Sequence, residues 1–187
     1  MSMASAVGPQ RTDLRPVHHV GYVVPDLRAA IDRWVTTVGA GPFFMMEHMQ
    51  LDEALYLGEP CVFDHSMAFG QWGPIAIELQ EMHDVQPAAL ARRVAADPGR
   101  VNHAAFVALD PVQERDRLAE LGMPMFLRLR KAHVEVTWHD NPDLGHAVEV
   151  HRSSPELIAL NDGFAQAARD WDGSEPLRPM PTPAYTA

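Results

Sequence analysis

Apolar residues in the first part of the chain recur with the period of a strand, then of a helix, and then of three more strands. Residues 17–24 are rich in β-branched residues and end at a Pro-Asp pair, which predicts a strand. The following apolar residues recur at helical spacing until glycines 39 and 41 end the pattern. The predicted elements are a strand at 17–24, a helix at 27–38, strands at 43–49 and 61–71 separated by a long loop, and a strand at 75–82.

The same order of elements is predicted a second time, over residues 101–152. A proline lies near the first turn of the second helix and a glycine follows its end, which is the usual asymmetry of helix termini. The predicted elements are a strand at 101–109, a helix at 111–121, and strands at 125–129, 133–139 and 147–151. The pattern therefore predicts two tandem β-α-β-β-β modules.

Three further segments lie outside these modules. Residues 1–15 are polar and are interpreted as a flexible arm, and residues 83–100 as a linker with a helix at 87–96. A C-terminal helix starts at Ser154 and can be interrupted at 161–163, and the proline-rich tail from 172 is expected to be extended or disordered. The predicted division is an arm at 1–15, a first module at 16–82, a linker at 83–100, a second module at 101–152, and a C-terminal helix and tail at 153–187.

The two modules also resemble each other in sequence. Residues 17–26 align with residues 101–110, and residues 75–79 with residues 146–150. The aligned positions include His19 with His103 and Glu78 with Glu149. Self-similarity of this kind is the mark of a duplicated unit. A duplicated unit with a histidine on its first strand and a glutamate on its last can build a four-ligand metal site where the two copies meet.

Strand alternation predicts how these four residues point. Each shares its face mainly with small or polar residues, while the opposite face is apolar, which predicts a curved sheet with a wet, concave inner face and helices outside. Two inward glutamates would be costly without a cation, and imidazole with carboxylate suits Ni, Co, Zn, Mn or Fe(II). A single strand histidine is more often structural, so the duplication is what favours the metal site. The predicted ligands of one divalent metal ion are His19, Glu78, His103 and Glu149.

Composition narrows the class of partner. The formal net charge is -10 and the pI is near 5.3, which argues against nucleic acid and anionic membrane surfaces. Apolar runs are too short for a membrane-spanning helix, and the N-terminus has no secretory pattern. Cys61 is the only cysteine, which excludes an intrachain disulfide and a thiolate metal site. We expect a cytoplasmic protein whose partner is a small-molecule substrate.

The motifs around the four predicted ligands resemble those of the vicinal oxygen chelate superfamily, which contains glyoxalase I, methylmalonyl-CoA epimerase, extradiol dioxygenases and bleomycin-resistance proteins. The resemblance covers about residues 16–152 and is clearest in the segments at 19–27, 77–79, 102–106 and 145–150. It implies an α+β fold in which paired βαβββ modules form a U-shaped cup around one divalent metal, and it is compatible with a homodimer. It also implies that His19, Glu78, His103 and Glu149 are the ligands, a set similar to that of glyoxalase I.

The resemblance implies a metal-dependent lyase or isomerase of the glyoxalase type. In such enzymes the metal stabilises an enediolate formed by removal of a proton next to a carbonyl, and Glu149 or Glu78 is the expected base. The alternatives are an acyl-thioester epimerase of the methylmalonyl-CoA type, an Fe(II) extradiol-type dioxygenase, and a non-catalytic binding or resistance protein. Epimerases usually have Gln where Glu78 stands, dioxygenases use two His and one Glu, and bleomycin-binding members generally lack the ligands.

Several other polar residues are candidates for supporting roles near the metal. His133, Glu135 and His139 alternate with Thr137 and are expected to line the cup, although a role as solvated strand residues is at least equally supported. His65 is a further candidate. Recognition of glutathione or CoA usually requires a basic patch, and the pair at 92–93 is interpreted as solvated surface groups.

Overall fold

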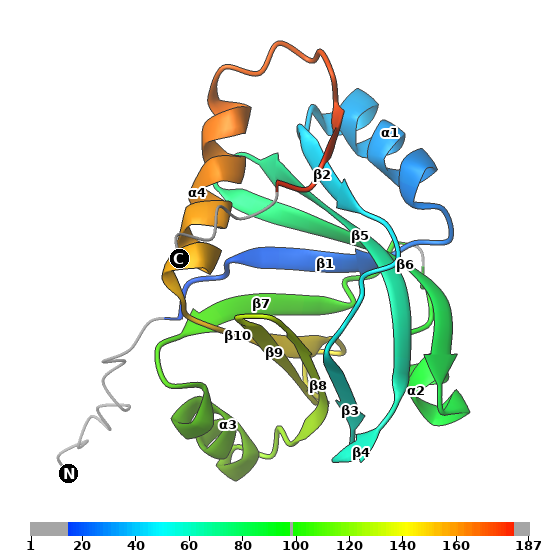
Figure 1. Cartoon of the computed structure of the whole chain (residues 1–187), viewed down its shortest axis with the longest axis vertical. Coiled ribbons are helices and arrows are strands. Elements are labelled where there is room, and N and C mark those ends of the chain that lie inside the picture. Colours follow the sequence, from blue (N-terminus) through cyan, green and yellow to red (C-terminus); the bar gives the residue numbers. More distant parts are fainter. Residues whose placement is uncertain (1–14, 98, 182–187) are drawn as a thin grey trace, which may run out of the picture.

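One large mixed sheet organises the molecule. The computed structural model describes residues 15–97 and 99–181, and in these ranges eleven strands share a single sheet with helices packed against it (Figure 1). Across the sheet the strands follow the order β11, β2, β5, β6, β1, β7, β10, β9, β8, β3 and β4. The predicted α+β class is confirmed at this level. The arm predicted at 1–15 lies, except for its last residue, outside the described residues.

The first half of the sheet contains the elements predicted for residues 16–82. Asp26 caps the helix as expected, because its side chain accepts a hydrogen bond from the Ala29 backbone N–H at 2.9 Å. Gly39 ends the helix in the left-handed region, at φ 68°. The elements are β1 (His19–Val23), α1 (Leu27–Val38), β2 (Phe43–Met46), β5 (Val62–Trp72) and β6 (Ile75–Gln86).

The second half repeats this order and meets the first at the centre of the sheet. Its elements are β7 (His103–Ala108), α3 (Pro111–Glu120), β8 (Met125–Lys131), β9 (Val134–His139) and β10 (Ala147–Arg152). β1 and β7 pair antiparallel, while β6 lies parallel to β1 and β10 lies parallel to β7. The two strands that carry histidine therefore lie side by side, and each strand that carries glutamate flanks one of them.

The long loop predicted between β2 and β5 contains two short strands that the sequence reading missed. They are β3 (Glu53–Tyr56) and β4 (Glu59–Pro60). β3 pairs antiparallel with β8 of the other half, in a register that places Glu53 opposite Arg130. This pairing was not predictable from local pattern, because the strand that accepts β3 lies far along the sequence.

The C-terminal extension is more ordered than predicted. α4 (Pro155–Arg169) runs through residues 161–163 without interruption, since the buried Phe164 ring packs on Phe44 and Phe69 and anchors the second half of the helix. Part of the tail forms β11 (Leu177–Pro179), which lies parallel to β2. Residues 182–187 lie outside the described part of the chain.

Helices cover both faces of the sheet, which corrects the prediction of a wet inner face. α1 packs on the apolar face, where Ile31 meets Ile77 and Leu79. The opposite face, which carries the predicted ligands, is called the ligand face below. α4 covers it in the first half, and α2 (Ala88–Arg93) places Leu90 in an apolar cluster over the second half. The predicted ligands therefore lie between packed layers.

Candidate metal centre

The four predicted ligands converge at the junction of the two halves. His19 of β1 and His103 of β7 face each other with their Nε2 atoms 3.3 Å apart. Glu78 of β6 and Glu149 of β10 close the group from either side, and one ligand atom from each residue lies within 4.8 Å of all the others. Residues that lie 25 to 130 positions apart in the sequence, such as His19 and Glu149, are thus brought to a single point.

The distances between donor atoms suit a shared cation. His19 Nε2 lies 2.9 Å from Glu149 Oε2 and 3.2 Å from Glu78 Oε2. His103 Nε2 lies 2.9 Å from Glu78 Oε2 and 3.5 Å from Glu149 Oε2. Ligands about 2.1 Å from a common ion are separated from their neighbours by about 3.0–3.4 Å, so the group has the size of a coordination shell.

All four side chains are buried, and the pKa values of Glu78 and His19 reflect close opposite charges. Burial alone would raise the pKa of Glu78, but hydrogen bonds from His103 and His19 outweigh it and lower the pKa to about 2. Burial alone would lower the pKa of His19, but hydrogen bonds to Glu149 and Glu78 raise it to about 9. Two buried carboxylates thus hold a proton on His19, which is the position where a metal ion would compete with it.

The atoms of the ligands that point away from the centre are also held. The Trp138 indole N–H donates to Glu149 Oε1 at 2.7 Å, and the Gln80 amide donates to Glu78 Oε1 at 3.0 Å. On the histidines, His103 Nδ1 lies 3.1 Å from Asn102 Oδ1, and His19 Nδ1 lies 2.8 Å from His18 Nδ1. Such outer partners fix the orientation of metal ligands and the tautomer of ligating histidines.

Three of these partners, together with His151, occupy matching positions of the internal repeat, and the sequence reading did not assign them a role. His18 and Asn102 each precede the histidine of their half, and Gln80 and His151 each stand two residues after the glutamate. His151 Nε2 lies 2.9 Å from Glu149 Oε2. The repeat places these residues at matching positions, but the paired residues differ in type, so only the geometry shows that each contacts the predicted ligand of its own half.

Gly21 is required for the arrangement. A Cβ atom placed on Gly21 would lie 2.0 Å from Cε1 and 2.2 Å from Nε2 of His103. The His103 ring therefore reaches Glu78 by crossing directly over the backbone of β1, where only glycine leaves room. Ala105 occupies the equivalent position in the second half.

The donor set fits a first-row divalent metal. Two imidazoles and two carboxylates, each held by an outer partner, match the ligand preference of Ni, Co, Zn, Mn or Fe(II). Gln80 Oε1 and His151 Nδ1 are buried and have no hydrogen-bond partner among the described residues, so polar atoms beside both glutamates remain to be satisfied. Residues 15–97 and 99–181 contain no other group of comparable donors.

The other polar candidates lie elsewhere, with one exception. Trp138 points to the ligand face, so Glu135, Thr137 and His139 project from the opposite face of β9, and the expectation that they line the site is wrong. His139 Nδ1 lies 3.2 Å from the Met123 carbonyl oxygen, and Glu135 pairs with Arg128. His65 is the exception, since it is buried near the centre. Burial lowers the pKa of His65, and the nearby charges of Glu78 and Glu149 raise it by a smaller amount.

Comparison with protein families places the chain. Residues 18–150 match the Glyoxalase/Bleomycin resistance protein/Dioxygenase superfamily, a region that includes all four predicted ligands. The chain belongs to this superfamily. Members of it include enzymes such as epimerases and dioxygenases, and the family is metal-dependent.

Solved structures show the same fold at low sequence identity. A hypothetical protein from Bacillus halodurans C-125 is 15% identical, with a TM-score of 0.53 over 76% of this chain and 96% of that one. Methylmalonyl-CoA epimerase from Mycobacterium tuberculosis is 18% identical, with a TM-score of 0.51 over 79% of this chain and 95% of that one. Comparison with curated protein sequences gave no match. Among the described residues, every helix is too short or too polar to cross a bilayer.

Proposed function

We propose that this protein is a divalent-metal-dependent lyase or isomerase of the glyoxalase type, which moves a proton next to a carbonyl of a small oxygen-chelating substrate. The observation that carries the proposal is the convergence of His19, Glu78, His103 and Glu149 from both halves of the sheet, each held by an outer partner. The proposal includes the view of the sheet as two βαβββ modules forming a U-shaped cup, with these four residues as the ligands.

The roles of the residues follow from their contacts. A bound divalent ion would supply Lewis-acid polarisation of substrate oxygens. His19 and His103 are oriented by His18 and Asn102 and would hold the ion. A carboxylate oxygen of Glu78 or Glu149 would take the proton from carbon and return it, and because the glutamates come from opposite halves they can serve two sides of a substrate.

The ligand set favours this reaction over the dioxygenase alternative. Extradiol dioxygenases use two His and one Glu, whereas here Glu78 is as close to the histidines as Glu149 is. Acyl-thioester epimerisation is the same proton transfer on a different carbonyl, so it is separated from the leading proposal by substrate rather than by site.

The experiment first measures metal content and then proton exchange. The protein is loaded in turn with Ni, Co, Zn, Mn and Fe(II), and exchange of the proton next to the carbonyl is followed by NMR in D₂O on 2-oxo compounds and acyl thioesters. We expect exchange with at least one metal, lowered about 10²–10⁴-fold in Glu149→Gln or Glu78→Gln. Glu135→Gln is the control, because Glu135 lies on the opposite face.

Three results would reject the proposal in different ways. If the protein binds none of these metals stoichiometrically, the proposal is rejected and the non-catalytic binding protein is the remaining alternative. Oxygen uptake by the iron-loaded protein with a catechol would favour a dioxygenase. If proton exchange is as fast in Glu78→Gln and Glu149→Gln as in the parent protein, neither glutamate is the base.

A further inference from the structure

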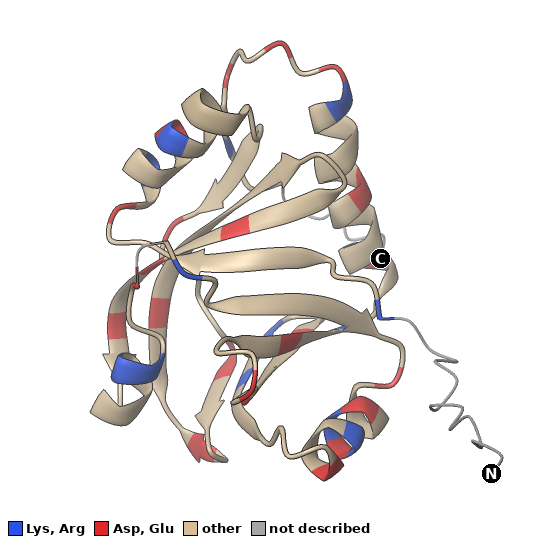
Figure 2. Cartoon of the chain, turned by 180° about the vertical axis from the view of Figure 1, so that it is seen from behind, with Lys and Arg blue, Asp and Glu red and all other residues tan. Residues whose placement is uncertain are grey.

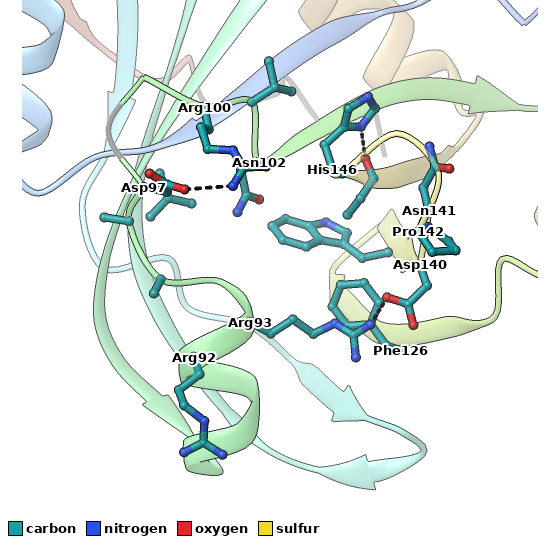
Figure 3. Close-up of a pocket in the computed structure, with 17 residues that line it drawn as sticks. Arg92, Arg93, Asp97, Arg100, Asn102, Phe126, Asp140, Asn141, Pro142 and His146 are labelled. Atoms are coloured by element: carbon teal, nitrogen blue, oxygen red, sulfur yellow. Dashed lines mark hydrogen bonds and ion pairs between the residues drawn. The ribbon is translucent and has the colours of Figure 1, made fainter.

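A pocket of about 510 Å³ lies at one end of the ligand face, beside the candidate metal centre. Figure 3 shows Arg93 and Phe126 on one side of it, and Arg100 and Asn102 on another, around a central indole ring. The volume falls in the range of about 300–1,000 Å³ that is typical of small-molecule sites.

The pocket lies next to the metal centre, because two residues of its lining contact predicted ligands. Ala147 lines the pocket and stands two residues before Glu149 on β10, so both point to the same face about 6.6 Å apart along the strand. Asn102 and Trp138 also line the pocket, and they are the residues that hold His103 and Glu149. A molecule in this pocket would therefore contact Asn102 and Trp138, which hydrogen-bond directly to the predicted ligands His103 and Glu149.

The rim of the pocket concentrates positive charge in an acidic protein. Arg93 lies with its guanidinium carbon 3.8 Å above the Phe126 ring and is paired with Asp140, which fixes its position at the wall. Arg100 Nη1 pairs with Asp97 at 3.3 Å, with both side chains mostly exposed, so this pair is weak and can be exchanged for another anion. Figure 2 shows how few basic segments the described chain carries, α2 being one of them.

We infer that this pocket binds the anionic end of the substrate, a carboxylate or phosphate group, through Arg93, Arg100 and the Asn102 amide; the inference rests on the proposed function for the other end of that molecule. Guanidinium groups hold such oxygens with paired, charge-assisted hydrogen bonds. The substrate class is then a small acid that carries an oxygen-chelating group at one end and a negative charge at the other.

Matched ligands test the charge requirement. Binding to the Co(II)-loaded protein is measured by calorimetry for 2-oxoglutarate and 2-oxopentanoate, which have the same chain length and differ in the distal carboxylate. A second pair, 2-oxoadipate and 2-oxohexanoate, differs in the same way and has a chain that is one carbon longer. We expect the diacid to bind at least about tenfold more tightly at one of these lengths, as one charge-assisted interaction allows.

Variants assign the preference to this pocket. Arg93→Gln and Arg100→Gln should each remove most of the preference for the diacid. Arg115→Gln is the matched control, since it removes the same charge from α3, and Arg115 does not line the pocket. Equal binding of the diacid and the monoacid at both lengths, or equal losses in all three variants, would overturn the inference.

A metal-free arm separates this inference from the proposed function. Glutarate and inorganic phosphate are titrated into the metal-free protein, and NMR follows the Trp138 indole N–H and the Arg100 and Asn102 backbone amides. Shifts with glutarate, phosphate or both, abolished in Arg100→Gln, support the anion site even when no metal binds, and show which anion it prefers. Unchanged spectra with both anions count against the site, whatever the metal analysis gives.

Discussion

At the scale of single residues, the candidate centre depends as much on the residues around the predicted ligands as on the ligands themselves. Gly21 gives the His103 ring the space to reach Glu78, and Trp138 and Gln80 hold the outer oxygens of the two glutamates. The geometry of the ligands is therefore set by residues that would never touch an ion. Metal binding should accordingly be sensitive to changes that leave all four donors in place.

Gly21→Ala is the sharpest change of this kind. The new methyl group would overlap the imidazole of His103, so the ring must move away from Glu78. We expect metal affinity, measured by chelator competition, to fall at least about tenfold, and the free energy of unfolding of the metal-free protein to fall by about 1–3 kcal/mol.

The matched control for Gly21→Ala is Ala105→Gly, at the equivalent position of the other half. It removes a methyl group instead of adding one, and should cost about 1 kcal/mol of stability or less while retaining most of the metal affinity. Normal metal affinity in Gly21→Ala would show that His103 does not need the position seen here.

Part of this residue-level arrangement could be predicted from sequence, and part could not. His19, Glu78, His103 and Glu149 stand out because both copies of the repeat keep the same residue types. His18 and Asn102 do not, because a histidine and an asparagine share a role only when each is seen beside a ligand imidazole. Trp138 has no equivalent in the repeat and is found only from coordinates.

At the scale of elements, α4 determines how closed the ligand face is in the first half. Phe164 is 3% exposed and its ring centroid lies 5.0 Å from that of Phe44 and 5.7 Å from that of Phe69. Phe69 in turn packs edge-on against the His19 ring at 5.1 Å. The C-terminal helix is thus connected to the candidate centre through one layer of aromatic rings.

Phe164→Ala should therefore loosen α4. The loss of a buried aromatic side chain predicts a decrease of about 3–5 kcal/mol in the free energy of unfolding, measured by urea denaturation. Ile158→Ala on the same helix is the control, because Ile158 is 51% exposed and the change should cost about 0.5 kcal/mol or less. Equal effects of the two substitutions would mean that α4 does not pack as described.

The elements also show where sequence reasoning reaches its limit. Strands and helices within each half were predicted from their periodicity, and the caps at Asp26 and Gly39 marked the ends of α1 correctly. β3, β11 and the unbroken α4 were missed for one common reason: each is stabilised by a partner far away in the sequence, on β8, β2 and β5. Local pattern carries no information about such partners.

At the scale of the whole molecule, the predicted ligands join the two halves. His19 and Glu78 come from the first half, and His103 and Glu149 from the second. A cation at this point would connect both halves of the sheet across the β1–β7 pair. Metal binding should for this reason raise the stability of the entire fold rather than of one part.

This stabilisation by metal should depend on pH in a defined direction. The folded-state pKa of His19 is raised to about 9, so the stability that its proton gives to the metal-free protein is fully present below about 6.5 and is lost as pH rises through about 9. Metal must displace that proton, so the increase in Tm caused by a fixed concentration of Zn or Co should grow from pH 6.5 to 9.

His19→Ala provides the comparison, since it removes the competing proton together with one donor. Its Tm should respond weakly to metal and show little pH dependence of that response over the same range. A metal-induced increase in Tm that shrinks with rising pH in the parent protein would contradict the description of His19 as a protonated, buried ligand.

The outermost strands restrict how copies of this protein could associate. β4 and β11 are two and three residues long, and each ends in a proline, Pro60 and Pro179, that has no N–H to offer a neighbouring strand. These two terminal strands are therefore poor templates for backbone pairing with another chain. Backbone pairing of a second copy onto β4 or β11 is therefore disfavoured, and with it the growth of fibrils from these two strands.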